Sequence, residues 1–305
     1  MSKDNQDFDN LFQSMQNGNI RALAKLLTAI ENEHQGIETV LEKLKPNAHI
    51  PVIGITGPPG AGKSSLINCL AEYWAKTLNL KVAILAIDPS SPFNLGALLG
   101  DRLRMSGLFT NKNIFIRSFA SRGALGGLAS RIVEATDLMR NANIDRIIIE
   151  TVGVGQSEIE IAGLADTTVL VLVPEAGDDI QAIKSGIMEI ADIFVVNKAD
   201  REGAAKFHVF LQNSLNHRKT SDWNPPIIET ISTQNIGIEQ LSIAIDKHIV
   251  SQKTKEKQAT LLAERAWKLI AEKRMKDVSR AGLENEITSQ LQKGDFNLYA
   301  LLKKY

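Results

Sequence analysis

The sequence has very little cysteine and no excess of charge. Its one cysteine, Cys69, cannot form an intramolecular disulfide, which fits the reducing conditions of a cytosol. Basic and acidic residues number 35 each, so the formal net charge is zero. Because polyanions are bound by broad basic surfaces, we expect that nucleic acid is not the main partner.

Long apolar runs are also missing. No apolar stretch reaches the about 18 residues that a membrane span needs, and the first ten residues are polar rather than a signal-peptide core. We therefore expect a cytoplasmic protein without membrane contact. The five histidines show no paired metal-ligand spacing, so we expect each to be a surface or helix-cap residue. Cys69 lies in an apolar helical pattern and is expected to pack in the core.

Three segments of different texture divide the chain. Residues 1–48 carry apolar residues at helical spacing between Ile20 and Ile30 and predict an N-terminal helical extension. Residues 49–252 alternate short apolar runs with helical patterns, as one α/β domain does. Residues 253–305 are charged and poor in strand formers, with an apolar stripe from Leu261 to Ile270. This C-terminal helical extension suits a lid, a packed flank or a dimer arm.

Seven short apolar runs in the middle segment read as strands. They begin near residues 49, 81, 113, 145, 168, 192 and 225. Their apolar residues are continuous rather than alternating, which is typical of strands buried on both faces. We therefore predict a doubly wound, mostly parallel sheet with helices on both sides.

A phosphate-binding loop follows the first of these strands. The motif G-x-x-x-x-G-K-[ST] comprises Gly57, Pro58, Pro59, Gly60, Ala61, Gly62, Lys63 and Ser64. It follows a strand and opens an amphipathic helix, the context in which such a loop curls its amides around phosphate. We expect Lys63 to reach the β- and γ-phosphates, Ser64 to ligate Mg²⁺ and Ser65 to contact the α-phosphate.

Carboxylates follow two other strands where a magnesium ligand is required. Asp88 ends one strand, Glu150 ends another, and Asp101 lies in the segment after Asp88. Each is a candidate Mg²⁺ ligand, and each could instead cap a helix or turn. Glu150 opens a Glu-Thr-Val-Gly run in the place of the Asp-x-x-Gly of many GTPases, so the Gly153 amide would sense the γ-phosphate.

A base-selecting motif ends a later strand. Asn197, Lys198 and Asp200 form N-K-x-D. The Asp200 carboxylate would accept from N1–H and the exocyclic N2–H of guanine, two donors that adenine lacks. Lys198 would pack its stem over the base, and Asn197 would tether the phosphate loop. Ser232 and Thr233, after the last strand, are candidate backbone donors to guanine O6.

With these motifs in place, the chain resembles the MeaB/ArgK family of methylmalonyl-CoA mutase-associated GTPases, which includes the animal MMAA proteins. The resemblance covers about residues 20–300. The phosphate loop is shared by many families, whereas the runs IDPSSP, GALLGDR and ETVGVGQSE are more discriminating.

The resemblance implies a dimeric P-loop GTPase of the SIMIBI branch, with Mg²⁺ and GTP or GDP bound. Such a protein escorts cobalamin into an acyl-CoA mutase and guards the cofactor against inactivation. It also implies a homodimer and contact with the adenosyltransferase that supplies cobalamin. Asp88 and Asp101 would belong to a first switch, Glu150 to Glu158 to a second, and Gly177 to Gly186, with Gln181 and Lys184, to a third that signals to the mutase.

Three other functions are alternatives to a mutase-associated GTPase. An ATP-using kinase of amino-acid transport is an older interpretation of the ArgK name, and Asp200 argues against it because the carboxylate penalises adenine. A nickel metallochaperone is a related class, but it would need the His/Cys sites that this sequence does not display. A scaffold without catalysis is disfavoured, because all the parts of a GTPase are present.

Overall fold

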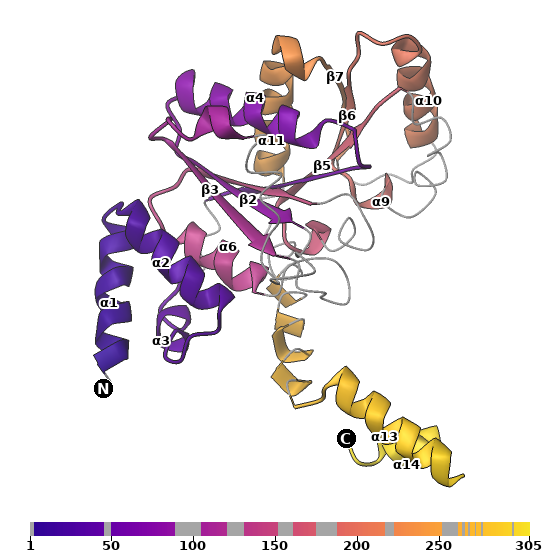
Figure 1. Ribbon diagram of the computed structural model, residues 1–305. Coiled ribbons are helices and arrows are strands. Elements are labelled where there is room, and N and C mark those ends of the chain that lie inside the picture. Colours follow the sequence, from indigo (N-terminus) through magenta and orange to yellow (C-terminus); the bar gives the residue numbers. More distant parts are fainter. Residues whose placement is uncertain are drawn as a thin grey trace. The chain divides into compact units, whose positions relative to one another are not determined.

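The computed structural model describes residues 3–45, 50–88, 105–120, 131–151, 161–174, 188–216 and 223–251, together with most of 262–305. The chain forms two compact units, Met1–Lys257 and Gln258–Tyr305 (Figure 1). Leu261, at the start of the predicted C-terminal stripe, lies outside the described residues.

The first unit contains a seven-stranded parallel sheet with the strand order β3-β2-β4-β1-β5-β6-β7. The predicted α/β fold is therefore confirmed, and every described strand pairing is parallel. All carboxyl ends meet at one edge, where ligands bind in doubly wound folds. The strands are β1 (Val52–Thr56), β2 (Val82–Asp88), β3 (Ile114–Ala120), β4 (Arg146–Glu150), β5 (Thr167–Leu172), β6 (Ile193–Asn197) and β7 (Ile227–Thr230).

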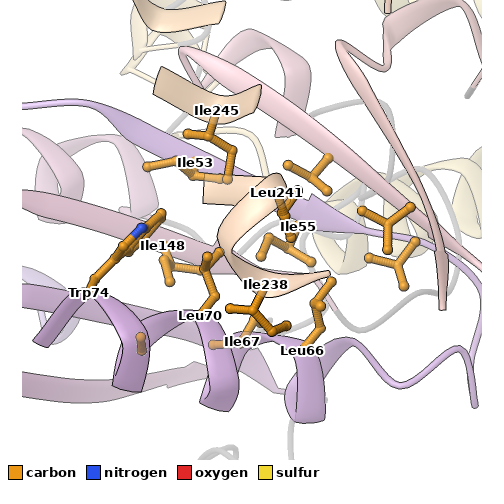
Figure 2. Packing of buried hydrophobic residues seen from close by; sticks show 14 of the residues in the cluster. Ile53, Ile55, Leu66, Ile67, Leu70, Trp74, Ile148, Ile238, Leu241 and Ile245 are labelled. Carbon is orange, nitrogen blue, oxygen red and sulfur yellow. The ribbon is translucent and has the colours of Figure 1, made fainter. Parts of the chain in front are cut away.

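One face of the sheet is covered by α4 (Lys63–Lys76) and α11 (Ile238–Ser251), and Figure 2 shows this core from close by. Ile53 and Ile148 from the strands belong to one apolar cluster with Leu70 and Trp74 of α4 and Ile245 of α11. Trp74 is fully buried and donates its ring N–H to Ser242 Oγ at 2.8 Å. This packing fixes α4, which carries the phosphate loop at its start.

Other helices cover the opposite face. Phe194 and Leu211 belong to a second apolar cluster, which packs α10 (Ala204–Asn216) on β5 and β6. The helix α6 (Ile132–Arg140) packs on β4. Alternate residues of one strand thus face different helices, which explains the continuous apolar runs. The short elements are η1 (Ser106–Leu108), η2 (Ile161–Gly163), α9 (Met188–Ile190) and η4 (Ser232–Gln234).

Three helices precede the sheet: α1 (Lys3–Gln16), α2 (Ile20–Glu31) and α3 (Glu38–Leu41). The Asn19 side chain caps α2 by accepting hydrogen bonds from the amides of Arg21 and Ala22. The helix buries its apolar stripe, although Ile20 at its start is 44% exposed. Glu31, at the end of α2, accepts a 2.6 Å hydrogen bond from Arg117 of β3. These helices therefore belong to the same unit as the sheet.

The second unit is helical where it is described, with α13 (Arg280–Lys293) and α14 (Leu298–Leu302). The Ser279 side chain caps α13, and Lys304 pairs with Glu286. Leu301 is the one buried hydrophobic residue among those described in this unit. Within the parts of both units that the structure covers, no helix is long and apolar enough to span a membrane.

Candidate active site

The phosphate loop connects β1 to α4 through backbone conformations that only glycine adopts freely. Gly57 has a φ of 141°, and a Cβ there would lie 2.1 Å from the carbonyl oxygen of Val171 in β5. Gly62 has a φ of 87°, and a Cβ there would lie 2.4 Å from the side-chain nitrogen Nδ2 of Asn197. The two glycines therefore allow close approach to β5 and to the N-K-x-D turn.

The Lys63 ammonium is held by backbone carbonyl groups of this loop. It donates hydrogen bonds to the carbonyl oxygens of Gly57 at 2.8 Å and Pro58 at 3.1 Å, and the residue is 7% exposed. A cation held there by the loop's own carbonyls places positive charge beside the α4 N-terminus, where an anion is favoured. Ser65, in the first turn of α4, is exposed.

Ser64 and Glu150 meet at the end of the loop. The Ser64 hydroxyl donates to Glu150 Oε1 at 2.7 Å, and Glu150 is 6% exposed. The sheet register brings them together, because Glu150 pairs with Ile55 near the carboxyl end of β1. A hydroxyl and a carboxylate oxygen in contact are hard oxygen ligands of the kind that Mg²⁺ takes, so these residues fit the ion that the fold implies.

The other predicted metal and switch residues are less fully placed. Asp88 ends β2, where its backbone pairs with Ala120 of β3. This position is at the same sheet edge as Glu150, but the Asp88 side chain lies outside the described residues. Asp101, Gly153 and the segment 177–186 lie outside them as well.

Asn197 connects the phosphate loop with the last strand. Its side-chain N–H donates to the carbonyl oxygen of Ala61 at 2.8 Å. Its Oδ1 accepts from the hydroxyls of Thr230 at 3.0 Å and Ser232 at 2.9 Å. Ser232 is 6% exposed and Thr230 is fully buried, so both bonds are shielded from water. This side chain therefore holds three segments in register.

The rest of the base-selecting motif is less buried than Asn197. Lys198 has a φ of 57° and donates to the carbonyl oxygen of Gly60 at 2.8 Å, so its stem lies alongside the loop. Asp200 and Thr233 are exposed. The structure thus places Lys198 and Asp200 in one turn after β6, and Ser232 and Thr233 after the neighbouring β7.

Two contacts in the site were missed in the sequence. The Thr151 hydroxyl donates to Thr56 Oγ1 at 3.0 Å, which ties the ends of β4 and β1 together beside Glu150. Cys69 of α4 donates its thiol hydrogen to the carbonyl oxygen of Ser232 at 2.9 Å, and the residue is only partly buried. Both contacts join segments far apart in the chain. The position of each threonine after an apolar run was the one available signal.

The histidine prediction is wrong for His248. This residue of α11 is 1% exposed and lies within 2.8 Å of the Thr167 hydroxyl and 3.2 Å of the Asp192 carboxylate. Trp223 packs on its ring edge-on, at 4.8 Å between centroids. The polar partners explain how an imidazole is buried here. In the described ranges no group of three or more His, Cys, Asp or Glu side chains could hold a metal ion.

A glycine-rich loop between a buried parallel strand and a helix, joined through asparagine to an N-K-x-D turn, defines a P-loop GTPase. Comparison with known families gives a closer assignment. The family model described as methylmalonyl-CoA mutase-associated GTPase MeaB matches residues 23–286, and the chain belongs to this family.

Named relatives agree with this membership. A Pyrococcus horikoshii protein named as a GTPase is 46% identical over 277 residues, which are 87% of this chain and 86% of that protein. GTPase ArgK of Escherichia coli is 36% identical over 76% of this chain and 72% of its own length. A crystal structure described as LAO/AO transport system kinase has a TM-score of 0.70 and 23% identity, with 100% of this chain and 97% of that chain covered. That likeness shows the fold alone.

Proposed function

We propose that this GTPase is the escort of a cobalamin-dependent acyl-CoA mutase of the methylmalonyl-CoA type. It gates the loading of the cofactor and protects the mutase from inactivation. The family match over residues 23–286 is the observation that carries this proposal. A Caenorhabditis elegans relative named methylmalonic aciduria type A homolog supports it, with 39% identity over 67% of this chain and 55% of that protein.

The proposed chemistry begins with the phosphates of GTP, which the loop amides and Lys63 would bind. Ser64 would hold Mg²⁺ with carboxylates chosen from Asp88, Asp101 and Glu150. When bound, the ion would act as a Lewis acid that stabilises negative charge on the phosphoryl oxygens. The contact between Ser64 and Glu150 supports this set, because it places one of the carboxylates at the loop.

Water attack on the γ-phosphate is the step for which this chain is least equipped. Val154 follows Gly153 at the position where Ras-type enzymes carry a glutamine that orients the water. Intrinsic turnover is therefore slow in this proposal, and the mutase completes the site. A slow intrinsic rate suits a regulatory GTPase, since GTP is then hydrolysed mainly when the partner is bound.

The partner signal would pass through residues 177–186. Gly177 and Gly186 bracket this polar segment, which follows β5 at the carboxyl edge of the sheet. Glycines at both ends would allow a hinge, and in this proposal the polar residues between them contact the partner. We propose that the γ-phosphate state orders this segment and that the mutase reads it.

Replacing Lys184 with alanine is expected to abolish most of the acceleration of GTP hydrolysis by the mutase. GTP affinity and basal hydrolysis should stay within a few-fold, because the change cuts the coupling between the proteins and leaves the phosphate loop intact. The measurement is GTP turnover with and without a cobalamin mutase, and Gln181→Ala is tested in parallel. Lys206→Ala, which removes an exposed cation from α10, is the charge-matched control. Full stimulation of both switch variants would exclude this relay.

We also propose a homodimer in which the C-terminal unit forms part of the interface. Several large apolar side chains among its described residues are exposed to solvent, including Trp267 at 74% and Tyr299 at 78%. Such side chains are the ones that protein interfaces enrich. A second copy of the same unit would cover them by two-fold symmetry.

Truncation before Lys253 is expected to convert the dimer into a monomer, because it removes all of these apolar side chains. Light scattering at micromolar protein measures the change. Trp267→Glu in the full chain should weaken the dimer without shortening the protein, and Lys273→Glu, at an exposed basic position of the same unit, is the control. A monomeric full-length protein, or a truncated protein that stays dimeric, would contradict the assignment of the interface.

The cellular setting follows from the proposed client. We place the protein in the cytoplasm, where it would meet the mutase and the adenosyltransferase that supplies cobalamin. The test of this setting is recovery of the mutase with the GTPase from native cytosol, with the GTP-bound and GDP-bound forms compared.

A further inference from the structure

The contact between Cys69 and the loop after β7 has no place in the chemistry described above. Cys69 is half-buried on α4, two turns after the phosphate loop, and its Sγ lies 2.9 Å from the carbonyl oxygen of Ser232. The two residues are separated by 163 positions in the sequence. This side chain therefore joins the helix of the phosphate loop to the segment expected to face the guanine ring.

The thiol keeps its proton for this contact. Burial raises the pKa of Cys69 above its usual value, and the negative charge of Glu72, one turn away, raises it further. A protonated thiol is a hydrogen-bond donor, and a carbonyl oxygen can accept it together with a second donor. The amide of Asn235 is that second donor, at 3.3 Å.

The geometry of the peptide bond carries the effect of the contact to the next residue. The carbonyl of Ser232 and the N–H of Thr233 belong to one planar trans peptide group, so they point in opposite directions. When α4 holds the carbonyl oxygen, the Thr233 N–H must point away from α4. The Ser232 hydroxyl is also fixed, on Asn197 Oδ1 at 2.9 Å. Rotation of this peptide group is thus restrained from both sides.

We propose that Cys69 is a positioning residue for recognition of guanine O6. Its thiol sets the plane of the peptide between Ser232 and Thr233, so that the Thr233 amide is aimed at the base. This inference rests on the proposed function, in which Ser232 and Thr233 supply the donors to O6. It adds a residue of the phosphate-loop helix to the determinants of base specificity.

The test compares two nucleotides that carry O6 with one that lacks it. Dissociation constants are measured for GDP, inosine diphosphate and 2-aminopurine riboside diphosphate, the last of which lacks the oxygen. The proteins are the wild type, Cys69→Ala, Cys69→Val and Cys69→Ser. Leu80→Val, which trims a half-buried residue of the same core beyond the end of α4, is the packing control.

In Cys69→Ala and Cys69→Val, GDP and inosine diphosphate should bind about three- to tenfold more weakly, the range expected for one neutral hydrogen bond. Binding of the 2-aminopurine nucleotide should not change. Cys69→Ser keeps a donor and should restore discrimination, and Leu80→Val should lower thermal stability alone. The valine variant fills the space of the thiol, so it answers the question if the alanine variant does not fold.

The remaining outcomes separate the two levels of the argument. A wild-type protein that binds GDP no better than the 2-aminopurine nucleotide would remove the proposed O6 contact, and the role of Cys69 with it. If the wild type discriminates and both variants without a donor do so equally well, only the role of Cys69 is overturned. Equal weakening of all three nucleotides, or failure of Cys69→Ser to restore discrimination, would also overturn it, because packing rather than the donated hydrogen bond would then matter.

Discussion

Replacing Asp200 with alanine is expected to weaken GTP binding by about 2–4 kcal/mol, the loss expected for two charge-assisted hydrogen bonds to guanine. This corresponds to roughly 30- to 1,000-fold in the dissociation constant. Asp200 is exposed in the turn after β6, so its removal should leave the fold intact. Titration calorimetry with GTP, and competition by ATP, measure the change.

Two further variants sharpen this test. Glu202→Ala removes another exposed carboxylate two residues away and should leave GTP affinity unchanged. Asp200→Asn should favour xanthosine nucleotides over guanosine nucleotides, because an amide can accept from N1–H and donate to the O2 of xanthine. A wild-type protein that binds ATP as well as GTP would contradict the assigned role of Asp200.

The strands of this fold could be predicted because burial on both faces leaves a direct mark in the sequence. Each of the seven apolar runs became a strand, and every position of β1, β5 and β6 is buried. The phosphate loop was equally predictable, since Gly57 and Gly62 adopt conformations that other residues rarely take. Local chemistry determines both features, so a local pattern reveals them.

Contacts between distant segments could not be predicted in the same way. Cys69 packs against the core as its neighbours predict, but the contact of its thiol with the carbonyl oxygen of Ser232 was not predicted. His248 reads as a surface residue, yet Thr167 and Asp192 satisfy it in the core. The strand order decides which residues meet at the sheet edge, and no run of residues encodes that order by itself. Ser64 and Glu150 were each predicted as magnesium ligands, but their direct contact follows from the register of β4 with β1 and was not predicted.

Replacing Glu150 with glutamine is expected to lower Mg²⁺-dependent GTP hydrolysis about 10- to 100-fold, the usual cost of losing a group that supports a metal. The side-chain oxygen of glutamine can still accept the hydrogen bond that the Ser64 hydroxyl donates to Glu150 Oε1 at 2.7 Å. The variant therefore removes the negative charge and preserves the hydrogen bond. GTP affinity should change less than turnover. Single-turnover hydrolysis across a series of Mg²⁺ concentrations measures both the rate and the apparent affinity for the ion.

The comparison of Glu150→Gln with Glu150→Ala separates the two contributions of this side chain. If charge near the ion dominates, both variants should be impaired alike and should require more Mg²⁺. If the hydrogen bond to Ser64 dominates, only the alanine variant should be slow. Glu134→Gln is the control, because it neutralises another buried carboxylate, one in the first turn of α6 that pairs with the N-cap residue Arg131. It should cost stability without altering the Mg²⁺ dependence.

Asp101→Ala is expected to behave as Glu150→Ala does. Normal turnover in both variants would remove these two carboxylates from the mechanism and leave Asp88 as the remaining candidate.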